Sequence, residues 1–225
     1  MNCIKSQIIA HIHTDFGSKF GVPRQSGVVE GLLARIVFEP EFRVAEAFRG
    51  LEDFSHLWLI WQFSEVKQKE WSPTVRPPRL GGNKRMGVFA TRSPFRPNPI
   101  GLSSVKLLKI DWDCAEAPVL VVAGADLMNL TPIIDIKPYL PYTDSHTDAT
   151  GGFTDALHQG TGTLKVVLSD TVAAQLPQEK LQALIQVLEC DPRPHYQQDV
   201  NRVYGMDFAG INIRFKVEND VLTVL

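Results

Sequence analysis

The stretch RLGGNKRMGVFATRSPFRPNPIGL, residues 79–102, is the most irregular part of this chain of 225 residues. Pro94, Pro97 and Pro99 each fix the backbone angle φ and remove a hydrogen-bond donor. The residue before a proline is also biased toward extended conformations. We therefore predict that residues 93–101 are neither helix nor central strand. They form a rigid irregular loop that positions the side chains it carries.

Short runs of β-branched and aromatic residues lie on both sides of this loop. They cover residues 27–38, 57–63, 86–91, 102–110 and 119–125, and Gly, Pro or Asp residues separate them. The runs are too close together for a helix between each pair, which argues against a doubly wound sheet. One short helix is predicted over residues 41–49, with Gly50 as its left-handed cap. The pattern predicts a mainly β fold, either a barrel or a sandwich.

The chain becomes polar and rich in glycine after Tyr142, which indicates a domain boundary near residue 150. Beyond it we predict a strand over residues 163–168, a helix over residues 179–189 and a terminal hairpin of residues 211–217 and 221–225. We expect two domains, a β domain of residues 1–150 and a small α+β domain of residues 151–225.

The composition is that of an ordinary soluble protein, with 44% hydrophobic residues, 21% charged residues and a formal net charge of −2. No apolar run approaches the roughly 20 residues of a membrane-spanning helix, and the amino terminus lacks a secretory signal pattern. We therefore expect a cytoplasmic protein with no membrane partner. Cys3, Cys114 and Cys190 are far apart and odd in number, so neither a disulfide framework nor a thiolate zinc site is indicated.

Basic residues are concentrated around the proline loop. Between Trp71 and Ile110 there is no Asp or Glu, and the basic residues are Arg76, Arg79, Lys84, Arg85, Arg92, Arg96, Lys106 and Lys109. Arg92 and Arg96 bracket the loop, and a guanidinium can bind a phosphate in a forked pair or stack on a purine. The segment is either a phosphate-binding surface or a solvated basic face that nearby acids balance. The two bracketing arginines favour the first interpretation.

A second polar motif, GADLMNLTPIIDIKPYLPY, occupies residues 124–142 and follows a predicted strand. We interpret it as another turn that prolines interrupt. Asp126 can accept hydrogen bonds from a ribose or an ammonium group, or it can cap a turn through its own backbone. Asp135 and Lys137 can form a surface ion pair of small energetic value.

Four stretches, GVPRQ at 21–25, FSHLW at 54–58, the proline motif at 87–102 and residues 126–142, closely resemble the TrmO/TsaA-like family in the same order. The stretch DPRPHY at 191–196 resembles a motif in the small carboxy-terminal domain of its bacterial members. The resemblance implies a small β-barrel domain that binds S-adenosylmethionine and a small α+β domain behind it. It also implies a homodimer that methylates N6 of N6-threonylcarbamoyladenosine at position 37 of threonine tRNA.

The resemblance also implies a set of cofactor-binding residues: Pro23, Arg24, Gln25, His56, Leu57, Arg92, Leu102, Asp126, Leu127, Met128 and Asn129. This chain has Asn129-Leu130 where other members have Asp-Gly, which leaves the local backbone open. No catalytic acid or base is assigned. The reaction needs no metal, because a protein mainly aligns the acceptor nitrogen with the methyl group and accepts its proton.

Five further residues are predicted to contact tRNA. Arg85, Arg96 and Lys137 are expected to meet the threonyl carboxylate or nearby phosphates. Arg193 and Tyr196 display a cation and an aromatic ring on a stiff Pro-rich turn, which suits a phosphate and an unstacked base of the anticodon loop. A purely structural Pro-Tyr turn is the equal alternative for these two residues.

Two other functions are weighed against methyl transfer. The motif His11-Ile-His13-Thr-Asp15 has a spacing that occurs in metal-dependent hydrolases, although alternation of this kind also describes one face of a strand. A non-catalytic RNA-binding barrel would explain the basic segment but not the pocket residues His56, Leu102 and Asp126. Binding of S-adenosylmethionine in the absence of RNA separates this alternative from the methyltransferase.

Overall fold

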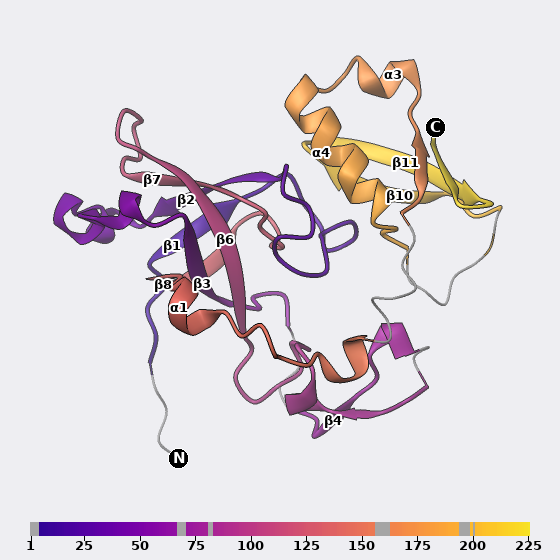
Figure 1. Ribbon diagram of the computed structural model, residues 1–225. Helices are drawn as coiled ribbons and strands as arrows, with labels where there is room; N and C mark the ends of the chain where they lie inside the picture. The colour runs from indigo at the N-terminus through magenta and orange to yellow at the C-terminus, as the bar shows by residue number, and fades with distance from the viewer. Residues whose placement is uncertain (1–4, 67–70, 81–82, 156–162, 194–198, 200) are drawn as a thin grey trace.

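The computed structural model describes residues 5–66, 71–80, 83–155, 163–193, 199 and 201–225. Its first part is a closed barrel in which every neighbouring pair of strands is antiparallel (Figure 1). The strand order is β1 (Ala10–His13), β2 (Leu33–Phe38), β7 (Val119–Ala123), β6 (Ile100–Asp111), β3 (His56–Gln62) and β8 (Thr131–Pro138). The prediction of a mainly β fold built on a barrel is confirmed.

The barrel interior is filled by alternate residues of each strand, as the period of two in a strand requires. Along β6 the residues Gly101, Ser103, Val105 and Leu107 are buried, while the residues between them are more exposed. Isoleucine and leucine side chains from five other strands complete the core, among them Ile12, Ile36, Leu57, Leu59, Leu120 and Ile133. Ser103 is therefore a polar residue on the otherwise apolar inner face of β6.

The segment predicted as one helix over residues 41–49 contains two 3₁₀ turns instead, η1 (Pro40–Phe42) and η2 (Ala45–Phe48), and a third, η3 (Leu51–Asp53), follows Gly50. Phe42, Ala45 and Phe48 repeat every three residues, which fits a 3₁₀ helix as well as an α-helix. Phe48 is buried against Phe38, with ring centroids 4.8 Å apart, and this contact holds the turns over the barrel end. Gly50 does adopt the left-handed conformation, at φ 80°.

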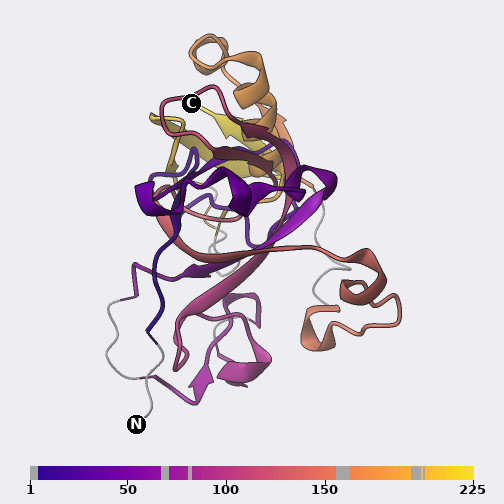
Figure 2. The same ribbon diagram turned by 90° about the vertical axis from the view of Figure 1, so that its left-hand side faces the viewer.

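An arm stands out from the barrel between β3 and β6 (Figures 1 and 2). It contains a two-stranded pair, β4 (Thr74–Val75) with β5 (Met86–Gly87), and the turns η4 (Pro78–Leu80) and η5 (Val88–Ala90). The predicted strand over residues 86–91 is therefore wrong beyond Gly87, because the chain turns at Val88. The irregular loop ends at Pro99 rather than at 101, because Ile100 already pairs with Gln62.

The segment interpreted as a proline-interrupted turn within residues 124–142 contains β8, which closes the barrel between β1 and β3. Its prolines are tolerated because Pro132 and Pro138 lie near the two ends of the strand. The short helix α1 (Pro141–Asp144) follows, and Trp58 Nε1 donates to Asp144 Oδ2 at 2.8 Å.

The carboxy-terminal part is a four-stranded sheet with helices on one face (Figure 1). Its elements are η6 (Gly152–Thr154) on the approach, then β9 (Lys165–Val167), α3 (Asp170–Ala173), α4 (Gln178–Glu189), β10 (Tyr204–Phe208), β11 (Ile211–Glu218) and β12 (Val221–Val224). The sheet order is β10-β11-β12-β9, with β12 and β9 parallel. The predicted helix and terminal hairpin are confirmed. Asn219 and Asp220 both have positive φ, as a two-residue hairpin turn requires.

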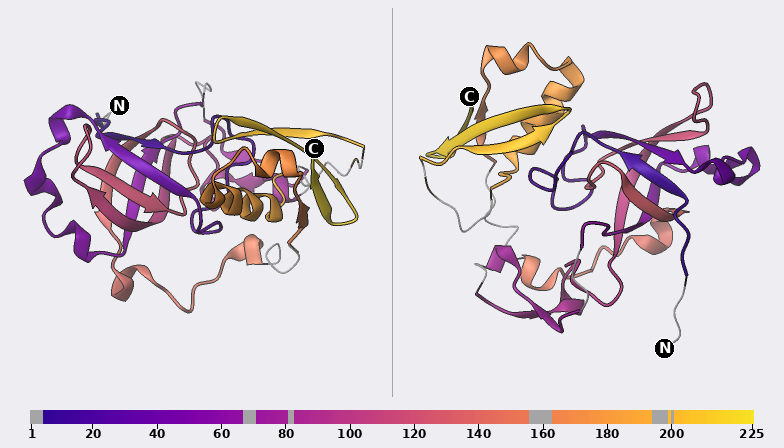
Figure 3. Two further views of the ribbon diagram at one scale, coloured as in Figure 1. Left: turned by 90° about the horizontal axis from the view of Figure 1, so that it is seen from above. Right: turned by 180° about the vertical axis from the view of Figure 1, so that it is seen from behind.

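The connection between β1 and β2, residues 14–32, packs into the carboxy-terminal part (Figure 3). Phe16 and Phe208 meet edge to face with ring centroids 5.5 Å apart, and Lys180 is paired with Asp15. Val29 and Leu32 belong to the same buried cluster, which explains why β2 begins at Leu33 rather than at residue 27. The same connection carries Pro23, Arg24 and Gln25 of the predicted cofactor set.

Candidate cofactor site

A largely shielded carboxylate, that of Asp126, lies just after β7 at one end of the barrel. Its Oδ1 accepts a hydrogen bond from the Ser103 hydroxyl at 2.6 Å, and Ser103 Oγ accepts one from Trp61 Nε1 at 3.0 Å. Ser103 on β6 and Trp61 on β3 are both buried. A continuous chain of hydrogen bonds therefore runs from the barrel core to Asp126.

The direction of this chain follows from its donors. An indole can only donate and a serine has one hydroxyl proton, so the Ser103 proton points to Asp126 while Trp61 occupies a lone pair. The glycine of the proline motif makes this arrangement possible. A Cβ at Gly101 would lie 2.2 Å from Trp61 Cε2, so only glycine lets the indole lie across β6.

Burial raises the pKa of the Asp126 carboxyl, because the charged form loses hydration. The Ser103 hydroxyl opposes this shift most strongly, and the charge of Arg92 and the backbone of Ser26 add to the opposition. A carboxylate held between burial and several donors is a strong candidate for binding a cation or the hydroxyls of a ligand.

Arg92 reaches this site from the start of the proline loop. Its Nη1 donates to Gln25 Oε1 in the β1–β2 connection. The same connection is fixed beside Asp126, because Ser26 Oγ accepts from Ser104 N at 3.2 Å and Gly27 N donates to Gly124 O at 2.9 Å. The structure thus brings Gln25, Arg92 and Asp126 together from three separate parts of the sequence.

The connection from β7 to β8 is held against the segment after β1. Thr14 N donates to Asn129 Oδ1 and Thr14 Oγ1 donates to Leu127 O, both at 3.1 Å. Leu130 has φ 64°, a left-handed conformation that glycine adopts freely and leucine only at a cost. The chain therefore keeps the backbone that the glycine of the family pattern would adopt.

The remaining predicted cofactor residues divide into three groups. Leu102 is 55% exposed beside Ser103, and Pro23 and Met128 are half-buried in the connections around Asp126. Leu57 and Leu127 are core residues, so a ligand can reach only their backbone. His56 lies further from Asp126 than these residues do. It pairs with Lys106, and Lys106 is three residues from Ser103 along β6, a distance of about 10 Å in a strand.

The residues predicted to contact tRNA have partners within the protein. Arg96 Nη1 donates to the carbonyl oxygens of Thr91 at 3.0 Å and Ser93 at 3.4 Å, which closes the proline loop. Arg85 Nη1 donates to Thr74 Oγ1 at 2.8 Å in the arm. Lys137 Nζ lies 3.0 Å from Asp135 Oδ2 in an exposed ion pair, as the sequence predicts.

Arg193 and Arg24 connect the two parts of the molecule. Arg24 Nη2 donates to the carbonyl oxygens of Arg193 at 3.0 Å and Asp191 at 3.4 Å. The Arg193 guanidinium makes a forked pair with the Asp191 carboxylate, at 2.8 and 2.9 Å, and this pairing raises the pKa of Arg193. Tyr196 lies outside the described residues.

Sequence reasoning missed Ser103, Trp61 and Ser26. The available signal is the period of two along residues 102–110, which places Ser103 on the same face as Val105 and Leu107. A polar residue on a predicted core face needs a hydrogen-bond partner, and that partner here is Asp126.

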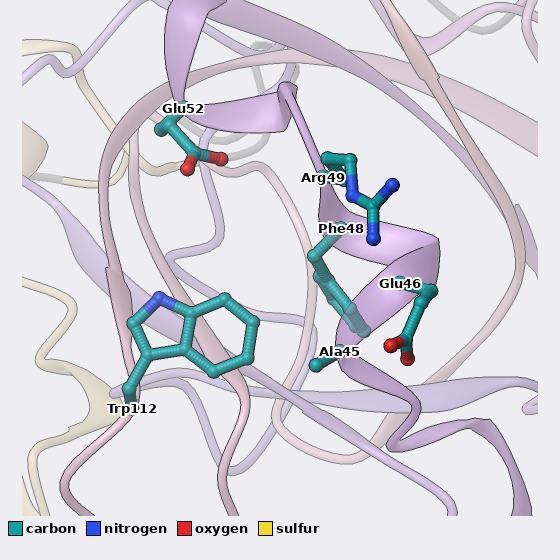
Figure 4. A pocket seen from close by; sticks show the side chains of 6 residues that line it. All are labelled: Ala45, Glu46, Phe48, Arg49, Glu52 and Trp112. Atoms are coloured by element: carbon teal, nitrogen blue, oxygen red, sulfur yellow. The ribbon is translucent and has the colours of Figure 1, made fainter.

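A hollow of about 250 Å³ lies at the opposite end of the barrel, between the 3₁₀ turns and Trp112 (Figure 4). Its lining includes Glu46, Phe48, Arg49 and Glu52. It is smaller than the roughly 300–1,000 Å³ of typical small-molecule sites, and none of the predicted site residues lines it.

The motif of the hydrolase alternative lies on β1. His11 Nδ1 is 2.9 Å from Glu39 Oε1. Within the part of the chain that the structure describes, no three His, Cys, Asp or Glu residues are grouped as metal ligands. Across the same residues, no helix is long and apolar enough to cross a membrane.

The structure is thus an antiparallel barrel with a carboxylate and an arginine at one end, followed by a small α+β part. The family model described as the tRNA-methyltransferase O N-terminal domain matches residues 11–145, and the model of the TrmO C-terminal domain matches residues 161–225. The chain therefore belongs to the TrmO family, as the sequence motifs predict.

Relatives and solved structures agree with this assignment. The chain is 40% identical to the tRNA (adenine(37)-N6)-methyltransferase of Escherichia coli strain K12, over 96% of this chain and 94% of that protein. It is 37% identical to a putative S-adenosylmethionine-dependent methyltransferase of Pseudomonas aeruginosa, over 96% and 94%. A crystal structure of TrmO superimposes with a TM-score of 0.79 at 31% identity, covering 100% of this chain and 98% of that one.

The donors and acceptors around Asp126 fit the chemistry of S-adenosylmethionine. That cofactor combines an ammonium group and ribose hydroxyls, which a carboxylate binds, with a carboxylate, which a guanidinium binds in a fork. Asp126 and Arg92 carry groups of these two kinds, and Leu102 is an exposed apolar residue next to Ser103.

Proposed function

We propose that this chain transfers the methyl group of S-adenosylmethionine to N6 of adenosine 37 in tRNA, with the N6-threonylcarbamoyl form in threonine tRNA as substrate. The Asp126 carboxylate, which accepts from Ser103 at 2.6 Å beside the charge of Arg92, is the observation that carries the proposal. The relatives that share almost the whole chain support it.

The chain's own residues bind and orient the reactants. Asp126 accepts hydrogen bonds from the ammonium or ribose hydroxyls of the cofactor, and Arg92 and Gln25 bind its carboxylate end. Pro23, Arg24, Leu102 and the backbone of residues 127–129 line the same site. S-adenosylmethionine supplies an electrophilic methyl group, so the protein's main task is to align the acceptor nitrogen with it.

The nature of the acceptor explains the preference for the threonylcarbamoyl form. An adenine N6 amino group is a poor nucleophile, and an attached carbamoyl group makes its N–H more acidic, which eases deprotonation. The threonyl carboxylate also gives a basic residue something to bind. Arg85, Arg96 and Lys137 are assigned to this carboxylate or to nearby phosphates.

For Lys137 the assignment requires exchange of partners. The ion pair of Lys137 with Asp135 is exposed and of small energetic value, so a ligand carboxylate can replace Asp135.

We assign Arg193 and Tyr196 to the anticodon loop. We also propose a cytoplasmic homodimer, with residues 1–150 binding the cofactor and residues 151–225 contacting tRNA.

Two measurements test the proposal. Arg92→Ala and Asp126→Ala should each weaken binding of S-adenosylmethionine by about 1–3 kcal/mol, with Arg85→Ala as an unaffected basic control. Threonine tRNA that lacks the threonylcarbamoyl group should not be methylated, whereas the modified tRNA should be. Equal turnover on both tRNAs would contradict the substrate, and RNA binding without any cofactor affinity would instead indicate a non-catalytic RNA-binding barrel.

A further inference from the structure

Two large aromatic side chains on the arm stack on each other in contact with solvent. Trp71 is 51% exposed and Phe89 is 73% exposed. Their ring centroids are 6.2 Å apart and their planes differ by 26°. Side chains of this size normally gain free energy from burial, so an exposed stacked pair needs an explanation.

The backbone shortly after Trp71 and directly before Phe89 is held in place. Thr74 pairs with Gly87 in the β4–β5 ladder, and Val88 N donates to Pro73 O at 3.0 Å. Val88 itself is buried, with only 1% of its surface exposed, and anchors the turn that carries Phe89. The two rings are thus presented by a fixed scaffold, which lowers the entropic cost of binding a third ring.

The arm that carries the pair is rich in basic residues, although Glu70 directly precedes Trp71 in the sequence. Residues 72–109 contain no Asp or Glu, and Arg76, Lys84 and Arg85 are exposed on the same arm. Such a surface repels a second copy of itself and attracts a polyanion. Exposed aromatic rings among basic side chains are the combination that binds single-stranded nucleic acid, in which the rings stack on bases and the cations contact phosphates.

We infer that Trp71 and Phe89 form a stacking platform for an unpaired base of the RNA loop that carries the methylated adenosine. The inference rests on the proposed function, since Phe89 precedes Arg92 of the cofactor site by three residues, a span of at most about 10 Å. The platform and the cofactor site therefore belong to one segment. A base next to the target adenosine can reach the platform while the target occupies the site.

The test measures binding of an anticodon stem-loop RNA to Trp71→Ala and Phe89→Ala. Each variant should bind roughly 5- to 150-fold more weakly, the range expected for loss of one base–aromatic stack. Trp71→Phe and Phe89→Tyr keep an aromatic ring and should stay near the wild-type affinity. Trp112→Ala is the matched control, because Trp112 is 46% exposed but lies outside residues 72–109, the segment without Asp or Glu.

Salt dependence separates stacking from phosphate contacts. Trp71→Ala and Phe89→Ala should leave the slope of log affinity against log salt unchanged, whereas Lys84→Ala should flatten it by about one unit. S-adenosylmethionine affinity should be unaltered in all of these variants.

Three outcomes would overturn the inference or its basis. If both alanine variants bind the RNA with wild-type affinity and still methylate tRNA, the stacking platform is contradicted. The proposed function is then unaffected. A change in sedimentation of the variants would show that a second copy covers the rings instead. Absence of RNA binding by the wild-type protein would remove the proposed function itself.

Discussion

The Ser103 hydroxyl lies 2.6 Å from Asp126 Oδ1 and donates its only proton to that oxygen. The geometry leaves no choice of direction, since Trp61 Nε1 occupies a lone pair of Ser103 Oγ from the core side. The Oδ1 atom of the carboxylate is thereby oriented by the protein. A residue of the barrel interior thus controls the orientation of the carboxylate that we propose binds the cofactor.

Removing the hydroxyl should change the pH dependence of cofactor binding. In Ser103→Ala, Asp126 loses a bond that favours its charged form, so the pKa of the carboxyl rises further. The acid limb of S-adenosylmethionine binding should then move to higher pH, and affinity at neutral pH should fall by about 1.5–3 kcal/mol. Calorimetry over a pH series measures both effects. Ser103→Thr retains the hydroxyl and serves as the control, and an unmoved acid limb would contradict the role of Ser103.

The charge of Asp126 should also cost folding stability. Because burial raises the pKa of this carboxyl, its contribution to stability is fully present below its ordinary pKa of 3.8 and is lost as pH rises through the folded-state value. Asp126→Asn has no charge to bury, so it avoids this loss of stability at neutral pH. Its amide oxygen can still accept the hydrogen bond from Ser103. We expect a higher Tm than wild type at pH 7, little difference at acidic pH, and weaker cofactor binding. A lower Tm at pH 7 would show that the charged form is favoured in the fold.

Leu130 should carry backbone strain. Its φ of 64° costs a residue with a Cβ about 1–2 kcal/mol, and its side chain is 56% exposed, so truncation loses little burial. Leu130→Gly should therefore be more stable than Leu130→Ala by about 1 kcal/mol, since both lose the exposed isobutyl group but only alanine keeps the Cβ that is strained at positive φ. Urea unfolding midpoints of the two variants measure the difference. Equal midpoints would mean that the left-handed conformation costs nothing here.

Substitutions in the carboxy-terminal turn should affect tRNA but not the cofactor. Arg24 binds the backbone carbonyl of Arg193, which any residue supplies, so Arg193→Ala keeps that contact. We expect Arg193→Ala and Tyr196→Ala to weaken tRNA methylation while S-adenosylmethionine affinity stays unchanged. Loss of cofactor binding in either variant, with cooperative melting retained, would place this turn in the cofactor site.

Local patterns in the sequence were enough to predict much of the fold. The prolines at 94, 97 and 99 exclude regular structure, and the helix of residues 178–189 follows from its periodic leucines. The hairpin around Asn219-Asp220 follows from turn chemistry. The same patterns could not distinguish a 3₁₀ segment from an α-helix over residues 41–49, because a spacing of three suits both and the contact of Phe48 with Phe38 decides.

The sequence by itself determined the family and the barrel class, and it singled out Arg92 and Asp126, because these depend on motifs that are continuous in the chain. Only the tertiary structure decided how those residues act. Closure of the barrel brings Trp61 and Ser103 beneath Asp126, and packing of residues 14–32 on the carboxy-terminal sheet brings Arg24 to Arg193. Burial, pKa and hydrogen-bond direction are properties of such contacts between distant residues, and no local pattern encodes them.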